Sequence, residues 1–136
     1  MSNEPVKRGL ASRNELAKLS PLVRKVQRAV DNKKYLERRL TLASFAHDLA
    51  SNRTYLSDMV HQQYGMTFSD FINHLRIAEA ERILHEVRDE MLIKDLYQRL
   101  GYNSATSFYR NFKRITGLST TEYIARLKEQ DEKEAE

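Results

Sequence analysis

The sequence predicts an all-α fold in which two helix-turn-helix units are joined by a long helix. Only two prolines and four glycines occur in 136 residues, and such a scarcity of breakers favours helices. Apolar residues recur at helical spacing, and the alternation typical of strands is nearly absent. A pattern of short helix, tight turn and second helix also occurs twice, so that the fold contains an internal repeat.

Composition excludes several classes of protein. The chain has no cysteine, which excludes disulfides and cysteine-ligated metal sites. No apolar run approaches the roughly 18 residues of a membrane span, and the first 15 residues lack a signal-peptide core. We therefore expect a cytoplasmic protein without a membrane partner.

The net charge of +4 is unevenly distributed along the chain. Residues 1–40 carry eleven Lys/Arg against four Asp/Glu, and residues 41–127 carry ten of each. Residues 128–136 carry two against five. A neutral central body binds a polyanion only through local clusters of cations.

The two ends of the chain differ from the body in composition. Residues 1–19 are predicted to be a basic tail followed by a short helix, which Ser12 and Glu15 open as a capping box. The charged residues 130–136 are predicted to be a solvated or frayed tail.

Residues 20–40 are predicted to form an extra N-terminal helix and a connection. Ser20 and Pro21 provide an N-cap followed by proline at the first helical position. The basic side chains from Arg24 to Arg39 are either a solvated helix face or an auxiliary contact to phosphates.

The first helix-turn-helix is predicted at about 41–65 and the linker helix at about 68–87. Thr41 and Asn52 are suited to N-caps, and Gly65 is suited to end the second helix of the unit. A linker helix of about 20 residues is about 30 Å long. Its apolar residues are Phe68, Phe71, Ile72, Leu75, Ala78, Ile83, Leu84 and Val87.

The second helix-turn-helix is predicted at about 92–117, and a final helix at about 119–129 that Ser119 and Glu122 open as a capping box. The repeat is visible as two sets of matching positions. Ile93, Leu96 and Leu100 match Leu42, Phe45 and Leu49, and Phe108, Phe112 and Gly117 match Leu56, Val60 and Gly65.

The second helix of such a unit has the width to enter the DNA major groove. From Ser104 to Gly117 the sequence holds no acid, and Lys113 and Arg114 follow an apolar stripe that would anchor the helix. A linker of about 30 Å is close to the roughly 34 Å between successive major grooves on one side of B-DNA. One chain is therefore predicted to read two adjacent major grooves.

Three stretches carry a resemblance to a known family: "LTLASFAHDLASNRTYLSDMV", "YGMTFSDFINHLRIAEAERIL" and "GYNSATSFYRNFKRITGLSTTEY". They resemble the DNA-binding domain of AraC/XylS-type transcription factors, most of all the output domains of hybrid two-component regulators. The resemblance implies that two recognition helices contact DNA. The implied contact residues are Arg53, Thr54, Ser57 and Asp58 in the first helix and Ala105, Thr106, Ser107, Tyr109 and Arg110 in the second.

The sequence departs from the family pattern at three positions. Asp58 stands where the family often has a basic or polar residue, and Tyr97 stands where it usually has a small alanine. Thr120 replaces the usual proline, which leaves Ser119 to cap the final helix alone.

These observations predict a sequence-specific, double-stranded DNA-binding transcriptional regulator of bacterial type, or the excised output domain of one. RNA polymerase and an upstream sensor or receiver domain are further candidate partners. The alternatives are a protein-interaction module on the same fold and an architectural DNA-binding factor for recombination or excision. Lys113 and Arg114 join the site as candidate phosphate contacts.

Catalysis, metals and cofactors are not expected. The four histidines include no pair at the i,i+4 spacing of metal ligands, and no glycine-rich phosphate loop occurs. We read His47, His61, His74 and His85 as exposed histidines on helices.

Overall fold

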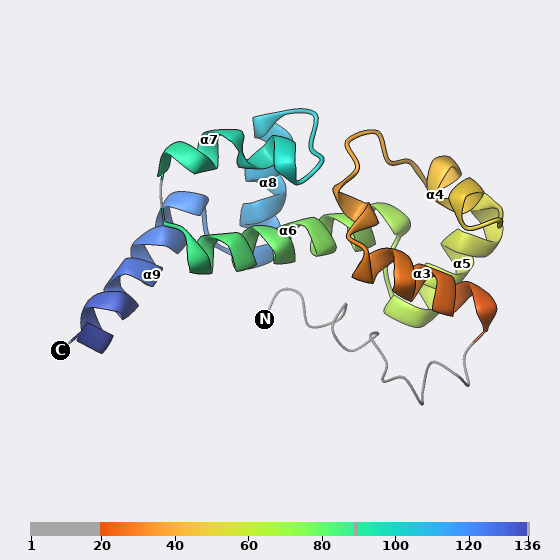
Figure 1. Cartoon of the computed structure of the whole chain (residues 1–136), viewed down its shortest axis with the longest axis horizontal. Coiled ribbons are helices and arrows are strands. Elements are labelled where there is room, and N and C mark those ends of the chain that lie inside the picture. The colour runs from red at the N-terminus through yellow and green to blue at the C-terminus, as the bar shows by residue number, and fades with distance from the viewer. Residues whose placement is uncertain (1–19, 89, 136) are drawn as a thin grey trace.

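The computed structural model describes residues 20–88 and 90–135, and every regular element in these ranges is helical. The predicted all-α fold with two helix-turn-helix units is confirmed (Figure 1). The predicted tail and short helix of residues 1–19 lie outside the described residues. The elements are α3 (Pro21–Asp31), η1 (Lys34–Leu36), α4 (Leu42–Asp48), α5 (Arg53–Tyr64), α6 (Phe68–Glu86), α7 (Glu90–Arg99), α8 (Ala105–Thr116) and α9 (Thr120–Ala135).

The long helix α6 forms the axis of an elongated molecule, with one helical unit at each of its ends (Figure 1). Helices α3, α4 and α5 pack around its first half, and we call this the first unit. Helices α7, α8 and α9 pack around its second half, and we call this the second unit. None of the described helices combines the length and the apolar character that crossing a bilayer requires.

Each unit has its own apolar core, and the two cores divide along α6 between Leu75 and Ile77. Large aromatic side chains fill both, because a small domain needs bulky residues to bury enough apolar surface. The first core contains Phe45, Leu56, Val60 and Phe71, and the second contains Leu84, Leu100, Phe108 and Phe112, all at most 1% exposed.

Helix α3 confirms the N-terminal helix that the sequence predicted after Ser20 and Pro21, and it packs as part of the first unit. Val26 is completely buried, and Val23 and Val30 join the same core. The basic side chains between these valines therefore occupy the remaining faces of a helix whose position is set by its buried side.

Side-chain caps begin the helices at the positions that the sequence predicted. Thr41 and Ser44 form a reciprocal capping box at the start of α4. Ser119 and Glu122 form a second box at α9, with both bonds at 3.1 Å. The backbone N–H of Ser119, helped by its hydroxyl, donates to the Glu122 carboxylate and lowers its pKa, since it stabilises the charged form. Thr120 is buried at the first position of α9, so the departure from proline does not prevent the helix from starting.

The final helix is longer than the sequence predicted, because α9 runs on to Ala135 instead of ending near residue 129. Residues 130–136 were predicted to be a solvated or a frayed tail, and residues 130–135 are solvated but helical rather than frayed. Glu, Lys, Gln and Ala are strong helix formers, and no breaker interrupts them. An ion pair between Arg88 Nε and Asp131 Oδ2 at 2.9 Å also ties this part of the helix to the segment that follows α6.

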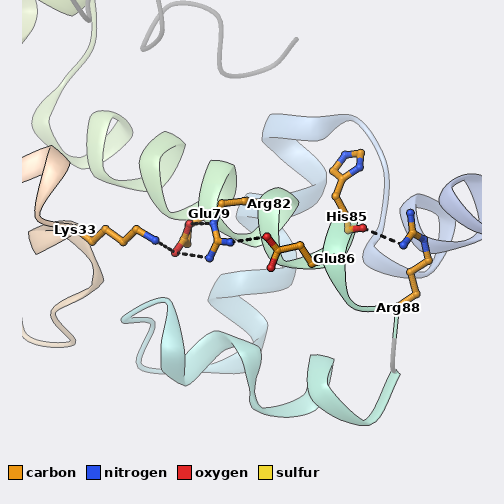
Figure 2. A network of polar contacts seen from close by, with 6 residues as sticks. All are labelled: Lys33, Glu79, Arg82, His85, Glu86 and Arg88. Carbon is orange, nitrogen blue, oxygen red and sulfur yellow. Dashed lines mark hydrogen bonds and ion pairs between the residues drawn. The ribbon is translucent and has the colours of Figure 1, made fainter.

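A buried carboxylate ties the connection after α3 to the middle of α6 (Figure 2). The side chain of Glu79 is 7% exposed and accepts bonds from Arg82 Nε at 2.7 Å and Lys33 Nζ at 2.9 Å. The Arg82 bond, helped by Lys33, lowers the pKa of Glu79 despite its burial. Arg82 also reaches the exposed Glu86 at 3.1 Å.

We predict that Glu79→Gln lowers the free energy of unfolding at pH 7 by about 1.5–3 kcal/mol, the range for hydrogen bonds to charged groups. Because the folded pKa of Glu79 is lowered, its contribution is present above the unfolded pKa of about 4.3 and is lost as pH falls through the folded pKa. Urea unfolding measures the free energy of unfolding of the native protein and of Glu79→Gln. The difference between them should be smaller at acid pH than at pH 7.

The matched control is Glu86→Gln, which removes an exposed carboxylate from the same helix and the same arginine. An exposed pair contributes about 0–1 kcal/mol. An equal loss of free energy of unfolding in Glu79→Gln and Glu86→Gln would contradict a special role for Glu79. So would a difference between native protein and Glu79→Gln that does not change with pH.

Candidate nucleic-acid interface

Helices α5 and α8 are equivalent elements of the two units, and we call them the reading helices. Each has 12 residues, with a side-chain N-cap from Asn52 in α5 and from Ser104 in α8. Each ends at a glycine in the left-handed region, Gly65 at φ 71° and Gly117 at φ 82°, where other residues are strained. Caps and stops are both 52 positions apart, so any residue of α5 has a counterpart 52 positions later in α8.

Both reading helices bury one side and present the other to solvent. The buried side of α5 holds Leu56, Val60 and Tyr64, and that of α8 holds Phe108, Phe112 and Ile115. At about 100° per residue, four exposed residues of each helix lie on the opposite side. These outward faces consist of Thr54, Asp58, His61 and Gln62 in α5 and of Thr106, Arg110, Lys113 and Arg114 in α8.

Six of the predicted contact residues lie on these outward faces, and Arg53 is exposed at the first position of α5. The others occupy the flanks. Ala105 and Ser107 are half-buried in the first turn of α8. Ser57 is also half-buried and lines a cavity of about 470 Å³ between α5 and the start of α6.

Tyr109, another predicted contact residue, is 39% exposed and leans against Phe108, with the ring centroids 5.3 Å apart. It lines a groove shared with Lys94 of α7 and Thr120 of α9. The side chain therefore stands at the edge of the outward face of α8.

His61 and Gln62 are exposed residues of the outward face that the sequence prediction left out. They are the counterparts of Lys113 and Arg114, 52 positions later. The internal repeat could have identified them. Aligning the two reading helices at their N-caps and glycine stops pairs His61 and Gln62 with the predicted contact residues Lys113 and Arg114.

The two outward faces differ in charge although they match in geometry. The face of α8 carries three cations, whereas the face of α5 carries the carboxylate of Asp58 and no lysine or arginine. Arg114 is held by Asp70 of α6 at 3.3 Å and by Asn111 at 2.9 Å. Across the described residues, no carboxylate forms an ion pair with Arg110 or Lys113, so these two cations face solvent.

Asp58 lies where the first reading helix meets the start of α3. It lines an open groove with Ser20, Leu22 and Tyr55. Tyr55 is 66% exposed, the largest value among the large apolar side chains of the described residues. Within residues 20–88 and 90–135, no group of three or more His, Cys, Asp or Glu is placed to hold a metal ion.

Comparison with known proteins agrees with this geometry. A family model described as a helix-turn-helix domain matches residues 45–126. The HTH-type transcriptional regulator YtdP of Bacillus subtilis, itself uncharacterised, is 32% identical over 87 residues, which cover 64% of this chain and 11% of YtdP. The regulator YisR of the same organism is 28% identical over 89 residues, covering 65% of this chain and 30% of YisR. The chain thus spans less than a third of the length of these curated relatives.

A solved structure shares both fold and sequence with the chain. The C-terminal domain of AraT, a response regulator from Geobacillus stearothermophilus, superimposes with a TM-score of 0.70 at 30% identity. The match covers 85% of this chain and 88% of that domain. It is long enough to include helix α3 together with both units.

Proposed function

The chain belongs to the helix-turn-helix domain family, in its AraC type as the resemblance predicted, and we propose that it binds double-stranded DNA sequence-specifically as a transcriptional regulator or as the output domain of one. The observation that carries this proposal is the pair of equivalent reading helices. Each turns four exposed residues away from its core, and the second adds a cluster of cations.

The chemistry of the outward faces suits the two tasks of DNA recognition, holding phosphates and reading bases. Lys113 supplies a mobile point charge for a phosphate, and the guanidinium of Arg110 has the fork that pairs with O6 and N7 of guanine. Thr54 and Thr106 are short hydroxyl side chains, so they allow the helices a close approach to base edges.

The length of α6 supports simultaneous binding by both units. Its 19 residues span about 28 Å, close to the roughly 34 Å between successive major grooves on one side of the duplex. One chain would then bind an asymmetric site of about two helical turns. An upstream sensor or receiver domain is part of this proposal, since the named relatives are much longer chains. RNA polymerase as a partner and a cytoplasmic location are further parts of it, because a transcriptional regulator acts where transcription takes place.

A salt titration against a duplex selected from random DNA and against an unselected pool separates the three candidate functions. A sequence-specific regulator binds the selected duplex about 10³–10⁷ times more tightly. An architectural factor binds both with similar affinity and a steep salt dependence. A protein-interaction module binds neither, and that result would refute the proposal.

We predict that Arg110→Ala weakens binding to the selected duplex by about 1–3 kcal/mol and relaxes the preference at one base position. The loss follows from removing a bidentate contact to one guanine. Fluorescence anisotropy with all four bases at each position measures it. An equal loss on every duplex would make Arg110 a phosphate contact instead.

The matched control is Lys113→Ala, three residues away on the same face. It should weaken binding about equally on all sequences and reduce the slope of log K against log salt by about 1. A change of base preference in this variant would contradict the division of roles between the two cations.

We predict that Asp58→Ala loses discrimination at one base pair, because its carboxylate accepts a hydrogen bond from N4 of cytosine. Asp58 is the counterpart of Arg110 and lies four residues from Thr54 on the outward face of α5, so it is placed to reach a base edge. Affinities for all four bases at each position, measured for both proteins, test this role. A uniform gain in affinity on every duplex would instead mean that Asp58 only repels phosphates.

A further inference from the structure

The apolar cores of the two units meet at one place, where Arg76 of α6 stands between Leu75 of the first core and Ile77 of the second. Among the described residues, Leu36 of η1 is the side chain that packs against both cores. The orientation of one unit relative to the other therefore depends on the contacts made around this point, in addition to the stiffness of α6.

The side chain of Arg76 contacts both units at once. The residue is 9% exposed. Its Nε donates to the carbonyl of Tyr35 at 2.7 Å, and Nη2 donates to the carbonyl of Glu37 at 2.9 Å. Tyr35 is a buried member of the first core. The guanidinium also lies over the ring of Tyr102, 5.1 Å from its centroid, and Tyr102 belongs to the second core.

The turn that carries Tyr102 is closed tightly around the same guanidinium. Gly101 has φ 87°, and a Cβ atom there would lie 2.7 Å from the carbonyl oxygen of Leu36 and 2.9 Å from Nη2 of Arg76. The Tyr102 hydroxyl donates to Asn73 Oδ1 at 2.8 Å. We call this arrangement of Arg76, the 35–37 segment and the 101–102 turn the joint.

The chemistry of arginine suits this position. Its planar fork supplies donors in fixed directions and its face stacks on an aromatic ring, whereas lysine offers a single point charge. The two carbonyls and the ring therefore determine the orientation of the guanidinium from both units together. An arginine that stabilised one core alone would have its partners in that core, but the partners of Arg76 are divided between two.

We propose that Arg76 is a positioning residue, which holds the two reading helices at one mutual angle and thereby restricts binding to DNA with one spacing between the two half-sites. This inference rests on the proposed function. Arg76 lies inside the joint rather than on either outward face, so it acts on DNA through the position of α5 and α8. Loss of the joint leaves each core intact and widens the range of angles between them, which α6 and the ion pairs Lys33–Glu79 and Asp70–Arg114 still limit.

The angle can be measured without DNA. The chain has no cysteine, so cysteines introduced at the exposed positions Arg28 in α3 and Ala125 in α9 give two unique sites for spin labels. Electron–electron distance measurements should show a narrow distribution for the native joint and a clearly broader one for Arg76→Met. Methionine keeps the apolar stem but lacks donors for the two carbonyls. The control Arg82→Met removes the same charge from the same helix outside the joint, and it should keep the narrow distribution.

The spacing of half-sites supplies a second readout that a purely structural role would not change. One base pair inserted between the half-sites of the selected duplex moves one of them by about 3.4 Å and rotates it by about 35°. On the duplex with the inserted base pair, native protein and Arg82→Met should bind at least about tenfold more weakly than on the original duplex. Arg76→Met should bind the original duplex more weakly than native protein does, and the insertion should weaken its binding by less than about threefold. Arg76→Lys, with one charged donor in place of the fork, should lie between them in both readouts.

A narrow distance distribution together with an unchanged spacing preference in Arg76→Met would overturn the inference. If that variant does not fold, as judged by circular dichroism, the same two outcomes in Arg76→Lys decide it. Failure of the native protein to select any duplex would refute the proposed function, whereas the distance measurement would still test the joint.

Discussion

A buried guanidinium without a carboxylate partner among the described residues governs the architecture of this molecule. Arg76 is held by two backbone carbonyls and an aromatic ring, and these partners come from two different cores. Burying a charge is costly unless its donors are satisfied, so the joint is stable only when all of its parts are in place. The tight approach at Gly101 follows from the same requirement, because a larger residue would hold the turn away from the guanidinium.

The two units of the internal repeat are alike in their reading helices but differ in the charge of their outward faces. Two small units, each with its own core, share helix α6, and the joint and the ion pairs Lys33–Glu79 and Asp70–Arg114 connect them further. Their reading helices match in length, N-cap and glycine stop. Their outward faces are not copies, because Arg110 and Lys113 of α8 correspond to Asp58 and His61 of α5. Under the proposed function, the second unit supplies most of the attraction to phosphates, and the first contributes short polar side chains and a carboxylate.

The sequence predicted the local features of the fold well and its long-range features poorly. Helix starts at Thr41, Asn52 and Ser119 were predictable because a cap bonds residues two or three positions away. The joint was not predictable, since Arg76 bonds residues 41 and 39 positions away and a lone arginine in a helical pattern reads as a solvated side chain. The helical end of α9 was missed because charged residues without an apolar stripe also suit a frayed tail.

In the candidate site, too, the positions set by local sequence were predictable and the long-range contacts were not. Thr54, Asp58, Thr106 and Arg110 could be placed from the resemblance and the helical period. His61 and Gln62 required the alignment of caps and glycine stops between the two reading helices. The tie between Arg114 and Asp70 of α6 joins elements 44 positions apart, so only the structure shows that this cation already has a partner.

The central claim is that one chain reads two adjacent major grooves with a fixed separation. Missing-nucleoside interference on a duplex selected from random DNA tests it most directly, because it identifies every base that binding requires. We expect two stretches of essential bases whose centres lie about one helical turn apart, 10–10.5 base pairs, for a single bound chain. A single stretch, or two stretches whose separation varies among selected duplexes, would contradict it.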